Sequence, residues 1–235
     1  FQKVKDLDYI LLISIIILSS ISLFVMYSTD GGEILYHTKS HFVKLVVFFL
    51  MMLTIAFLNI KLWHISAYLF YLTIIFLLVC VSFFGISVSG SQRWLDLYFI
   101  VLQPSELMKI SIILCLAKYY HRLKLTDVNN FTTIFIPIIV IVIPMILVLS
   151  QPDLGTSILI VLSGLVILWL GGVKMKYFFY SFVSFLIALP FIISFLKPYQ
   201  KLRILTFLDP DRDPLGAGYQ IIQSKIAIGS GGFYG

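Results

Sequence analysis

Long runs of apolar residues, separated by short polar segments, dominate this chain. A helix that crosses about 30 Å of hydrocarbon needs about 20 mostly apolar residues, because each residue advances about 1.5 Å along the helix axis. Six runs meet this requirement, and a seventh does so apart from two charged side chains near its start. The pattern therefore predicts seven membrane-spanning helices, over residues 9–27, 42–58, 67–86, 104–120, 132–149, 155–170 and 177–196.

Prolines bear on how these segments form helices. Pro104 suits the first turn of a helix, where its missing N–H group is not needed, and residues 110–117 behind it are almost wholly apolar. A span is therefore expected here, with an amphipathic helix at the membrane surface as the alternative. Pro137, Pro144 and Pro190 lie inside other spans and predict kinks, because neighbouring helices can satisfy the carbonyl groups that they leave free.

Composition supports the same class of protein. Apolar residues make up 60% of the 235 residues, charged residues only 12%, and the mean hydropathy is +1.03, far from the balance of a soluble domain. We therefore expect an all-α polytopic membrane protein, with residues 1–235 in one integral membrane domain. The first span is too long for a cleavable signal and no small-residue cleavage site follows it, so we expect it to be retained.

Basic residues in the short loops indicate the orientation of the spans. They concentrate in the N-terminal segment and in every second loop: Lys3, Lys5, Lys61, Lys118, Arg122, Lys124, Lys174 and Lys176. Because cytoplasmic loops are richer in lysine and arginine, the N-terminus is predicted to be cytoplasmic and residues 197–235 to begin a large loop outside the membrane. The net charge of +6 is thus explained by membrane topology, and no nucleic-acid partner is expected.

Charged residues at the ends of the spans are the candidates for chemistry. A charge at membrane depth costs about 2.5–3.5 kcal/mol, so it usually faces a protein interior or a wet cavity. Glu106 and Lys109 are three residues apart and share a helix face, where they either neutralise each other or bracket a third group. Asp153 either caps the sixth helix or pairs with Lys109, since both residues begin helices that enter from the same side.

Other polar patterns carry less information. Cys80 and Cys115 lie in separate spans, which favours buried, unpaired thiols, and the four histidines have no zinc-site spacing. In the last segment, residues 201–208 are expected to form a helix at the membrane surface. The glycines after Lys225 lack a P-loop pattern but predict a backbone nest that binds an anion.

Four sequence blocks carry a resemblance to a known family. They are Ser-Gly-Ser-Gln-Arg-Trp-Leu at residues 89–95, Gln-Pro-Ser-Glu-Leu-Met-Lys at 103–109, Gln-Pro-Asp-Leu-Gly-Thr-Ser at 151–157, and Asp-Pro-Leu-Gly-Ala-Gly-Tyr-Gln at the start of 213–232. In this order they resemble the signature blocks of the SEDS family (shape, elongation, division and sporulation), in particular its RodA-like rod-shape branch. They extend over more than half the chain, which makes the resemblance specific.

The resemblance implies a bundle of about ten spans in the bacterial inner membrane that polymerises lipid II, the undecaprenyl-pyrophosphate-linked disaccharide pentapeptide, on the outer face. In this glycosyl transfer, the 4-hydroxyl of one sugar attacks the anomeric carbon of another and displaces the lipid pyrophosphate. Such chemistry needs a base, and a cation or a divalent metal such as Mg or Mn for the leaving group; no organic cofactor is implied. The implied partner is a class B penicillin-binding protein, the transpeptidase, within the elongation machinery.

By the same resemblance, the family's functional positions fall on particular residues of this chain. Those that match a polar network in a central cavity are Glu106, Lys109 and Asp153, and the substrate-binding candidates are Arg93, Trp94, Gln103, Gln223, Ser224 and Lys225. Arg93 and Lys225 are cationic, so they are expected either to contact the pyrophosphate or to anchor their loops to the headgroups of membrane lipids.

One feature that the resemblance implies is absent from these residues. The family's catalytic aspartate lies in a Pro-Glu-x-x-Thr-Asp-Phe-like block, and no such block occurs before Gly235. We therefore expect the chain to be truncated at its C-terminus and inactive alone, with the activity belonging to the longer protein. Two alternatives for that protein are a flippase or transporter of a lipid-linked precursor, whose intramembrane charges form a translocation path, and a non-catalytic scaffold for the transpeptidase.

Overall fold

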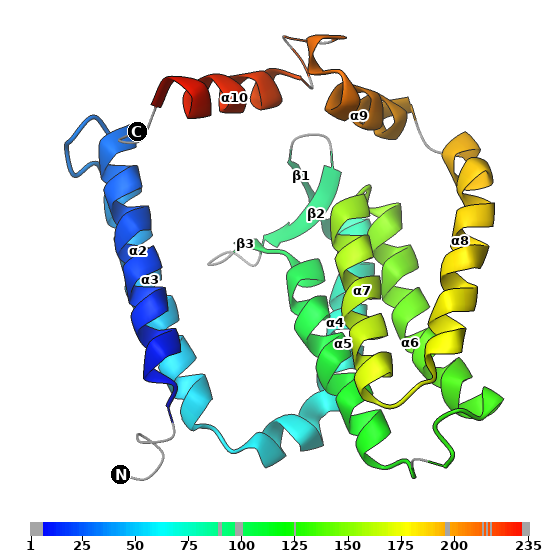
Figure 1. Ribbon diagram of the computed structural model, residues 1–235. Helices are drawn as coiled ribbons and strands as arrows, with labels where there is room; N and C mark the ends of the chain where they lie inside the picture. The colour runs from blue at the N-terminus through cyan, green and yellow to red at the C-terminus, as the bar shows by residue number, and fades with distance from the viewer. Residues whose placement is uncertain are drawn as a thin grey trace. The chain divides into compact units, whose positions relative to one another are not determined.

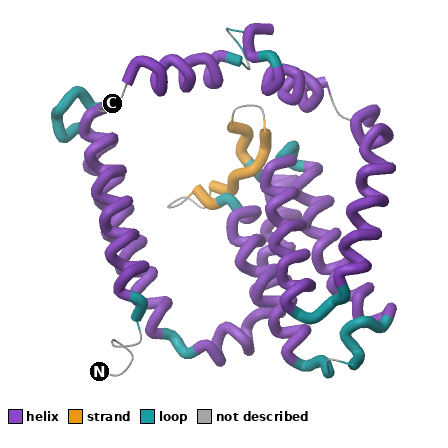
Figure 2. Tube along the Cα trace, in the orientation of Figure 1, coloured by secondary structure: helices purple, strands orange, loops and turns teal. Residues whose placement is uncertain are grey.

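The computed structural model describes residues 7–88, 91–96, 101–124, 126–195, 198–212, 214, 216 and 218–231. Its long helices (Figure 1, Figure 2) are α2 (Tyr9–Thr29), α3 (Tyr36–Phe57), α4 (Ile60–Phe84), α5 (Pro104–His121), α6 (Phe131–Ser150), α7 (Leu154–Leu170) and α8 (Met175–Phe195). Each predicted span corresponds to one of these helices. α3 and α4 begin earlier than predicted, because hydropathy locates the apolar part of a helix and their first turns carry polar side chains such as His37 and Lys61.

Length and composition allow α2, α3, α4 and α6 to cross a membrane, and α7 and the segment Met175–Phe191 of α8 are shorter apolar helices. α5 is less apolar because it carries Glu106, Lys109 and Lys118. It runs antiparallel to α4 (Figure 1) and buries Met108 and Ile112 completely. α5 is therefore packed in the helix bundle, which supports the predicted span; that α5 crosses the membrane stays a prediction, since it is not among the helices that length and composition select.

Contacts divide the chain into two compact units. Unit 1 comprises Phe1–Leu123 and Phe135–Ile167, and unit 2 comprises Lys124–Ile134 and Leu168–Gly235. Besides α8, unit 2 contains α9 (Pro198–Leu208), the short 3-10 helix η1 (Pro210–Arg212) and α10 (Tyr219–Gly231). The predicted helix at 201–208 is present as α9, whereas α10 is not among the predicted helices.

Polar contacts join α2 to α3. The N-cap residue of α3, Leu35, provides no side-chain cap. The carboxylate of Asp30 at the end of α2 replaces it, because it accepts hydrogen bonds from the backbone N–H and the hydroxyl of Thr38, at 3.0 and 2.6 Å. Further along the two helices, the Ser22 hydroxyl lies 2.8 Å from Nε2 of His41. These contacts fix the register of the α2–α3 hairpin.

Two local features fit α6 against its neighbours. Pro144 has no N–H, so the Val140 carbonyl one turn earlier lacks its helical donor; it accepts a hydrogen bond from the Tyr71 hydroxyl of α4 instead, at 2.9 Å. Gly164 of α7 faces Ile141, and a Cβ atom at Gly164 would lie 2.5 Å from that side chain. The bond from Tyr71 confirms the prediction, for Pro144, that a neighbouring helix satisfies the freed carbonyl. The absence of a side chain at Gly164 permits a close approach of α6 and α7.

The connection between α4 and α5 is a small antiparallel sheet, which the all-α prediction missed. It contains β1 (Ile86–Val88), β2 (Ser91–Asp96) and β3 (Val101–Leu102), in the order β1-β2-β3. Strands of two to six residues are too short to appear in a hydropathy pattern that selects runs of about 20 residues. The sheet matters for the site because β2 carries Arg93.

Candidate functional site

Arg93 links the β-sheet to the turn between α6 and α7, within unit 1. Its Nη2 atom donates a hydrogen bond to the Pro152 carbonyl at 2.7 Å, and its Nη1 atom lies 3.6 Å from Oδ2 of Asp153. The Asp153 side chain is only 8% exposed and that of Arg93 23%. A carboxylate this buried needs a compensating charge, and Arg93 provides it.

Asp153 also begins α7. Its Oδ1 atom accepts from the Thr156 backbone N–H at 3.1 Å, and its Oδ2 atom accepts from the Thr156 hydroxyl at 2.8 Å. These bonds satisfy donors that the first turn of a helix leaves free, so the predicted cap is confirmed. Next to it, the buried Gln151 amide donates to the Leu78 carbonyl of α4 at 2.9 Å. The turn is therefore held at once by α4, α7 and the sheet.

Glu106 and Lys109 form the predicted pair at the start of α5. The Lys109 Nζ atom lies 2.8 Å from Oε2 of Glu106, and the two side chains are 26% and 53% exposed. The alternative partnership of Lys109 with Asp153 is wrong for the described residues, because Asp153 is paired with Arg93. The sequence offered no means of choosing Arg93, which lies far from Asp153 along the chain and on a strand that was not expected.

The remaining unit 1 candidates lie close to these charges in sequence. Trp94 is partly buried and pairs with Ile86 across the sheet. Gln103 stands at the N-cap position of α5, and its amide donates to the Ser105 hydroxyl at 3.2 Å. In Arg93, the Nε atom is buried and has no hydrogen-bond partner among the described residues. Arg93 thus acts first as an anchor for the sheet, and its contact with a pyrophosphate stays a prediction.

The candidates of the last segment lie on α10, in unit 2. Gln223, Ser224 and Lys225 are exposed, and the Ser224 hydroxyl donates to the Gln220 carbonyl one turn earlier. The predicted backbone nest is wrong as far as Gly231, because α10 continues through that residue and its N–H groups belong to a helix. The last four glycine-rich positions lie outside the described residues. Lys225 is therefore an exposed cation on a helix.

The divalent metal expected from the resemblance stays a prediction. No group of three or more His, Cys, Asp or Glu side chains comes together in the described part of the chain. Cys80 and Cys115 are both free, as predicted; Cys115 is buried, whereas Cys80 is only partly buried and the prediction of a buried thiol is wrong for it.

Comparison with known proteins places these features in a family. Residues 5–235 match the family described as cell cycle protein, FtsW/RodA/SpoVE. The chain is 46% identical over 168 residues to the peptidoglycan glycosyltransferase MrdB of Escherichia coli K12, covering 70% of this chain and 44% of that protein. It is 39% identical over 210 residues to the probable peptidoglycan glycosyltransferase FtsW of Buchnera aphidicola (Schizaphis graminum), covering 87% and 59%. The chain thus spans about half the length of these relatives.

Solved structures give the same result. A structure described as showing the structural coordination of polymerization and crosslinking by a peptidoglycan synthase complex matches with a TM-score of 0.81 and 29% identity, covering 97% of this chain and 67% of that chain. The rod shape determining protein RodA of Thermus thermophilus shares the fold, with a TM-score of 0.66 and 21% identity, covering 77% and 59%. With a family match over nearly its whole length, this chain belongs to the SEDS family of multi-pass membrane proteins, the family of FtsW, RodA and SpoVE.

Proposed function

We propose that this protein is a peptidoglycan glycosyltransferase that polymerises lipid II on the outer face of the bacterial inner membrane. The observation that carries the proposal is the meeting of separate family blocks in unit 1: Arg93 from one block binds the Pro152–Asp153 turn from another. α5 begins with the Glu106–Lys109 pair of a third block. Because α4 and α5 are antiparallel and the turn is bonded to the end of α4, these charges belong to one end of the helices.

In this proposal, the residues of the chain bind and orient the substrate. The partly exposed Lys109 supplies positive charge for the pyrophosphate, and Glu106 holds the ammonium group through the 2.8 Å pair. Arg93 and Asp153 fix the sheet beside them. The base that accepts the proton of the attacking 4-hydroxyl comes from the aspartate block that follows in the longer family members.

We further propose the elongation branch, a cytoplasmic N-terminus and a transpeptidase partner. The identity of 46% to MrdB, against 39% to an FtsW, supports elongation and rod shape, although over 168 residues against 210. The distribution of lysine and arginine among the loops supports the orientation. The similarity to a peptidoglycan synthase complex, at a TM-score of 0.81, supports a class B penicillin-binding protein as the partner.

The test is lipid II polymerisation in detergent, with a class B penicillin-binding protein and with or without a divalent metal. This chain is compared with a version that carries, after Gly235, the C-terminal part that the curated relatives have in addition. Glycan strands from the extended protein alone support the proposal, and their loss in Lys109→Met but not in Lys124→Met supports the role of Lys109. Binding of lipid II without strands in the extended protein would favour the flippase or scaffold.

A further inference from the structure

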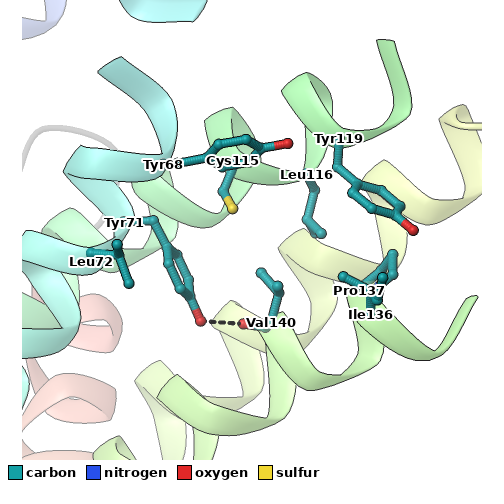
Figure 3. Close-up of a pocket in the computed structure, with 9 residues that line it drawn as sticks. All are labelled: Tyr68, Tyr71, Leu72, Cys115, Leu116, Tyr119, Ile136, Pro137 and Val140. Atoms are coloured by element: carbon teal, nitrogen blue, oxygen red, sulfur yellow. Dashed lines mark hydrogen bonds between the residues drawn. The ribbon is translucent and has the colours of Figure 1, made fainter. Parts of the chain in front are cut away.

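A cavity lies between α4, α5 and α6, within unit 1 and away from the Arg93–Asp153 pair. It has a volume of about 350 Å³. Figure 3 shows that Tyr68, Tyr71 and Leu72 of α4 line it together with Cys115 and Tyr119 of α5. The Tyr71 hydroxyl is already bonded to the Val140 carbonyl, so its polar atom is satisfied. The space is therefore an apolar one, of the kind that stays dry or accepts a hydrocarbon chain.

A cluster of basic side chains lies where α4 begins and α5 ends. The rings of His64 and His121 are 5.1 Å apart, and His64 also interacts electrostatically with Lys118 and Arg122. Lys118 is only 7% exposed, and its Nζ atom lies 2.8 Å from the Ile65 carbonyl. No carboxylate pairs with any of these four basic side chains among the described residues. Lys118 and Arg122 thus bring positive charge to this end of the two helices, and no acidic partner lies beside them among the described residues.

The cavity and this basic cluster (His64, Lys118, His121 and Arg122) are adjacent. Residues four apart on a helix share a face, so His64 lies one turn beyond Tyr68 on the face that lines the cavity. Arg122, the C-cap residue of α5, lies three residues after Tyr119, a spacing that also keeps it on the cavity side. Tyr68 touches both regions, since it lines the cavity and its ring lies 4.5 Å from the Lys118 ammonium. Charged groups at the helix ends therefore continue directly into an apolar space.

The dipole of α5 accounts for part of the cluster only. Cations near a helix C-terminus are stabilised by its partial negative charge, which explains Lys118, His121 and Arg122. His64 lies near the N-terminus of α4, where the dipole is positive, and its Nε2 atom is buried without a hydrogen-bond partner among the described residues. A polar headgroup that lies between the two helix ends would supply the hydrogen-bond partner that the His64 ring lacks.

We propose that this site binds an anionic phospholipid, with its phosphate at the basic cluster and one acyl chain in the cavity beside Tyr68, Leu72 and Cys115. A phospholipid of the surrounding membrane has the required order of groups, with a charged head at the membrane surface and hydrocarbon below it. The site is separate from the charges assigned to catalysis above and does not depend on that assignment.

The experiment is native mass spectrometry of the full chain in detergent, titrated with dioleoyl-phosphatidylglycerol or dioleoyl-phosphatidylcholine. One lysine or arginine near a membrane surface changes the affinity for an anionic lipid about fivefold. Arg122→Gln is therefore expected to weaken phosphatidylglycerol binding about fivefold, whereas Lys124→Gln, an exposed basic position outside the cluster, is the matched control. Arg122 is exposed, so its replacement leaves the packing intact.

A second pair of variants tests the acyl chain. Leu72 is 61% exposed at the cavity and Leu69 is 69% exposed on the same helix, but only Leu72 lines the cavity. Leu72→Trp is expected to weaken phosphatidylglycerol binding by at least about fivefold, and Leu69→Trp to leave it unchanged. Elution in size-exclusion chromatography and circular dichroism check that each variant is folded.

Three results would overturn the proposal. Equal binding of phosphatidylglycerol and phosphatidylcholine to the unaltered chain would show that the negative charge of the lipid is not recognised, and this comparison needs no variant. Equal effects of Leu72→Trp and Leu69→Trp on phosphatidylglycerol binding would show that no acyl chain occupies the cavity. Displacement of phosphatidylglycerol by millimolar inorganic phosphate would show a site for a free anion instead of a lipid.

Discussion

The Arg93–Asp153 pair allows a quantitative prediction for Arg93→Met. Methionine keeps an apolar stem but removes both the hydrogen bond to the Pro152 carbonyl and the positive charge. Breaking a fully buried pair costs about 3–5 kcal/mol. Arg93 is 23% exposed, however, and its 3.6 Å distance to the carboxylate exceeds the usual length of about 2.7–2.9 Å for a charged hydrogen bond, so we assign about 1–2 kcal/mol to the pair. The hydrogen bond from a charged donor adds about 1.5 kcal/mol, which gives an expected loss of about 2.5–3.5 kcal/mol.

The assay is reversible unfolding of the purified protein in mixed micelles, with increasing dodecyl sulfate and helix content followed by circular dichroism. Asp153→Asn removes the charge but keeps an oxygen for the Thr156 N–H, so a smaller loss of about 1 kcal/mol is expected. In the double variant, the two losses should overlap by about 1 kcal/mol. The predicted magnitudes are refuted if Arg93→Met costs no more than the exposed control Lys124→Met, or if the double-variant cycle shows no coupling.

The Arg93→Lys variant distinguishes between two roles of Arg93, as an anchor of the sheet and as a contact for pyrophosphate. Lysine keeps the charge but cannot hold a carbonyl and a carboxylate in the fixed fork of a guanidinium. If Arg93 is an anchor, the Arg93→Lys variant should lose more than half of the unfolding free energy that the Arg93→Met variant loses, measured by the same unfolding curve. If the lysine variant instead keeps full stability but loses lipid II binding, then the substrate contact is the main role of Arg93.

Two further predictions concern hydrogen bonds elsewhere in unit 1. Tyr71→Phe leaves the Val140 carbonyl without a donor and should cost about 1–2 kcal/mol in the unfolding assay. In a Pro144→Ala background, residue 144 has an N–H group again, so the cost of Tyr71→Phe should fall below about 0.5 kcal/mol. An equal cost in both backgrounds would contradict this account of α6. The hydrogen bond from the Thr38 hydroxyl holds the pKa of Asp30 below its ordinary value. Because the folded-state pKa is lowered, the Asp30 carboxylate stabilises the fold at neutral pH, and this stabilisation is lost as the pH falls from about 4 through the lowered pKa. Asp30→Asn should therefore flatten the acid side of a stability profile recorded from about pH 6 to pH 2, and an unchanged profile would argue against the bond.

The helices were predictable because their cause is local. A run of about 20 apolar residues has to satisfy its backbone within the membrane, and a helix does so without help from other segments. The Asp153 cap and the Glu106–Lys109 pair were predictable for the same reason, since the partners in each contact are three residues apart. Pro144 likewise made it predictable that a neighbouring helix would supply a donor to a freed carbonyl of α6, although the sequence did not identify Tyr71 as that donor.

The remaining contacts depend on segments that meet only in the folded chain. Arg93 is 59 residues from Pro152, and the strand that carries it has only six residues, so hydropathy indicated neither the strand nor its partner. α10 was missed because its glycines, among them Gly229, have low helix propensity, although the helix continues through Gly231. The basic cluster on α4 and α5 appeared in the sequence only as loop charges, since its members belong to different helices.

The separation of Arg93 from its partners has a consequence for biosynthesis. At about 5–20 residues per second, a ribosome needs about 3–12 s to make the 59 residues between Arg93 and Pro152. During this interval the strand of Arg93 has left the ribosome before its acceptors exist. The sheet therefore reaches its final position only after α6 has been inserted and α7 has begun, so it docks late in the assembly of unit 1.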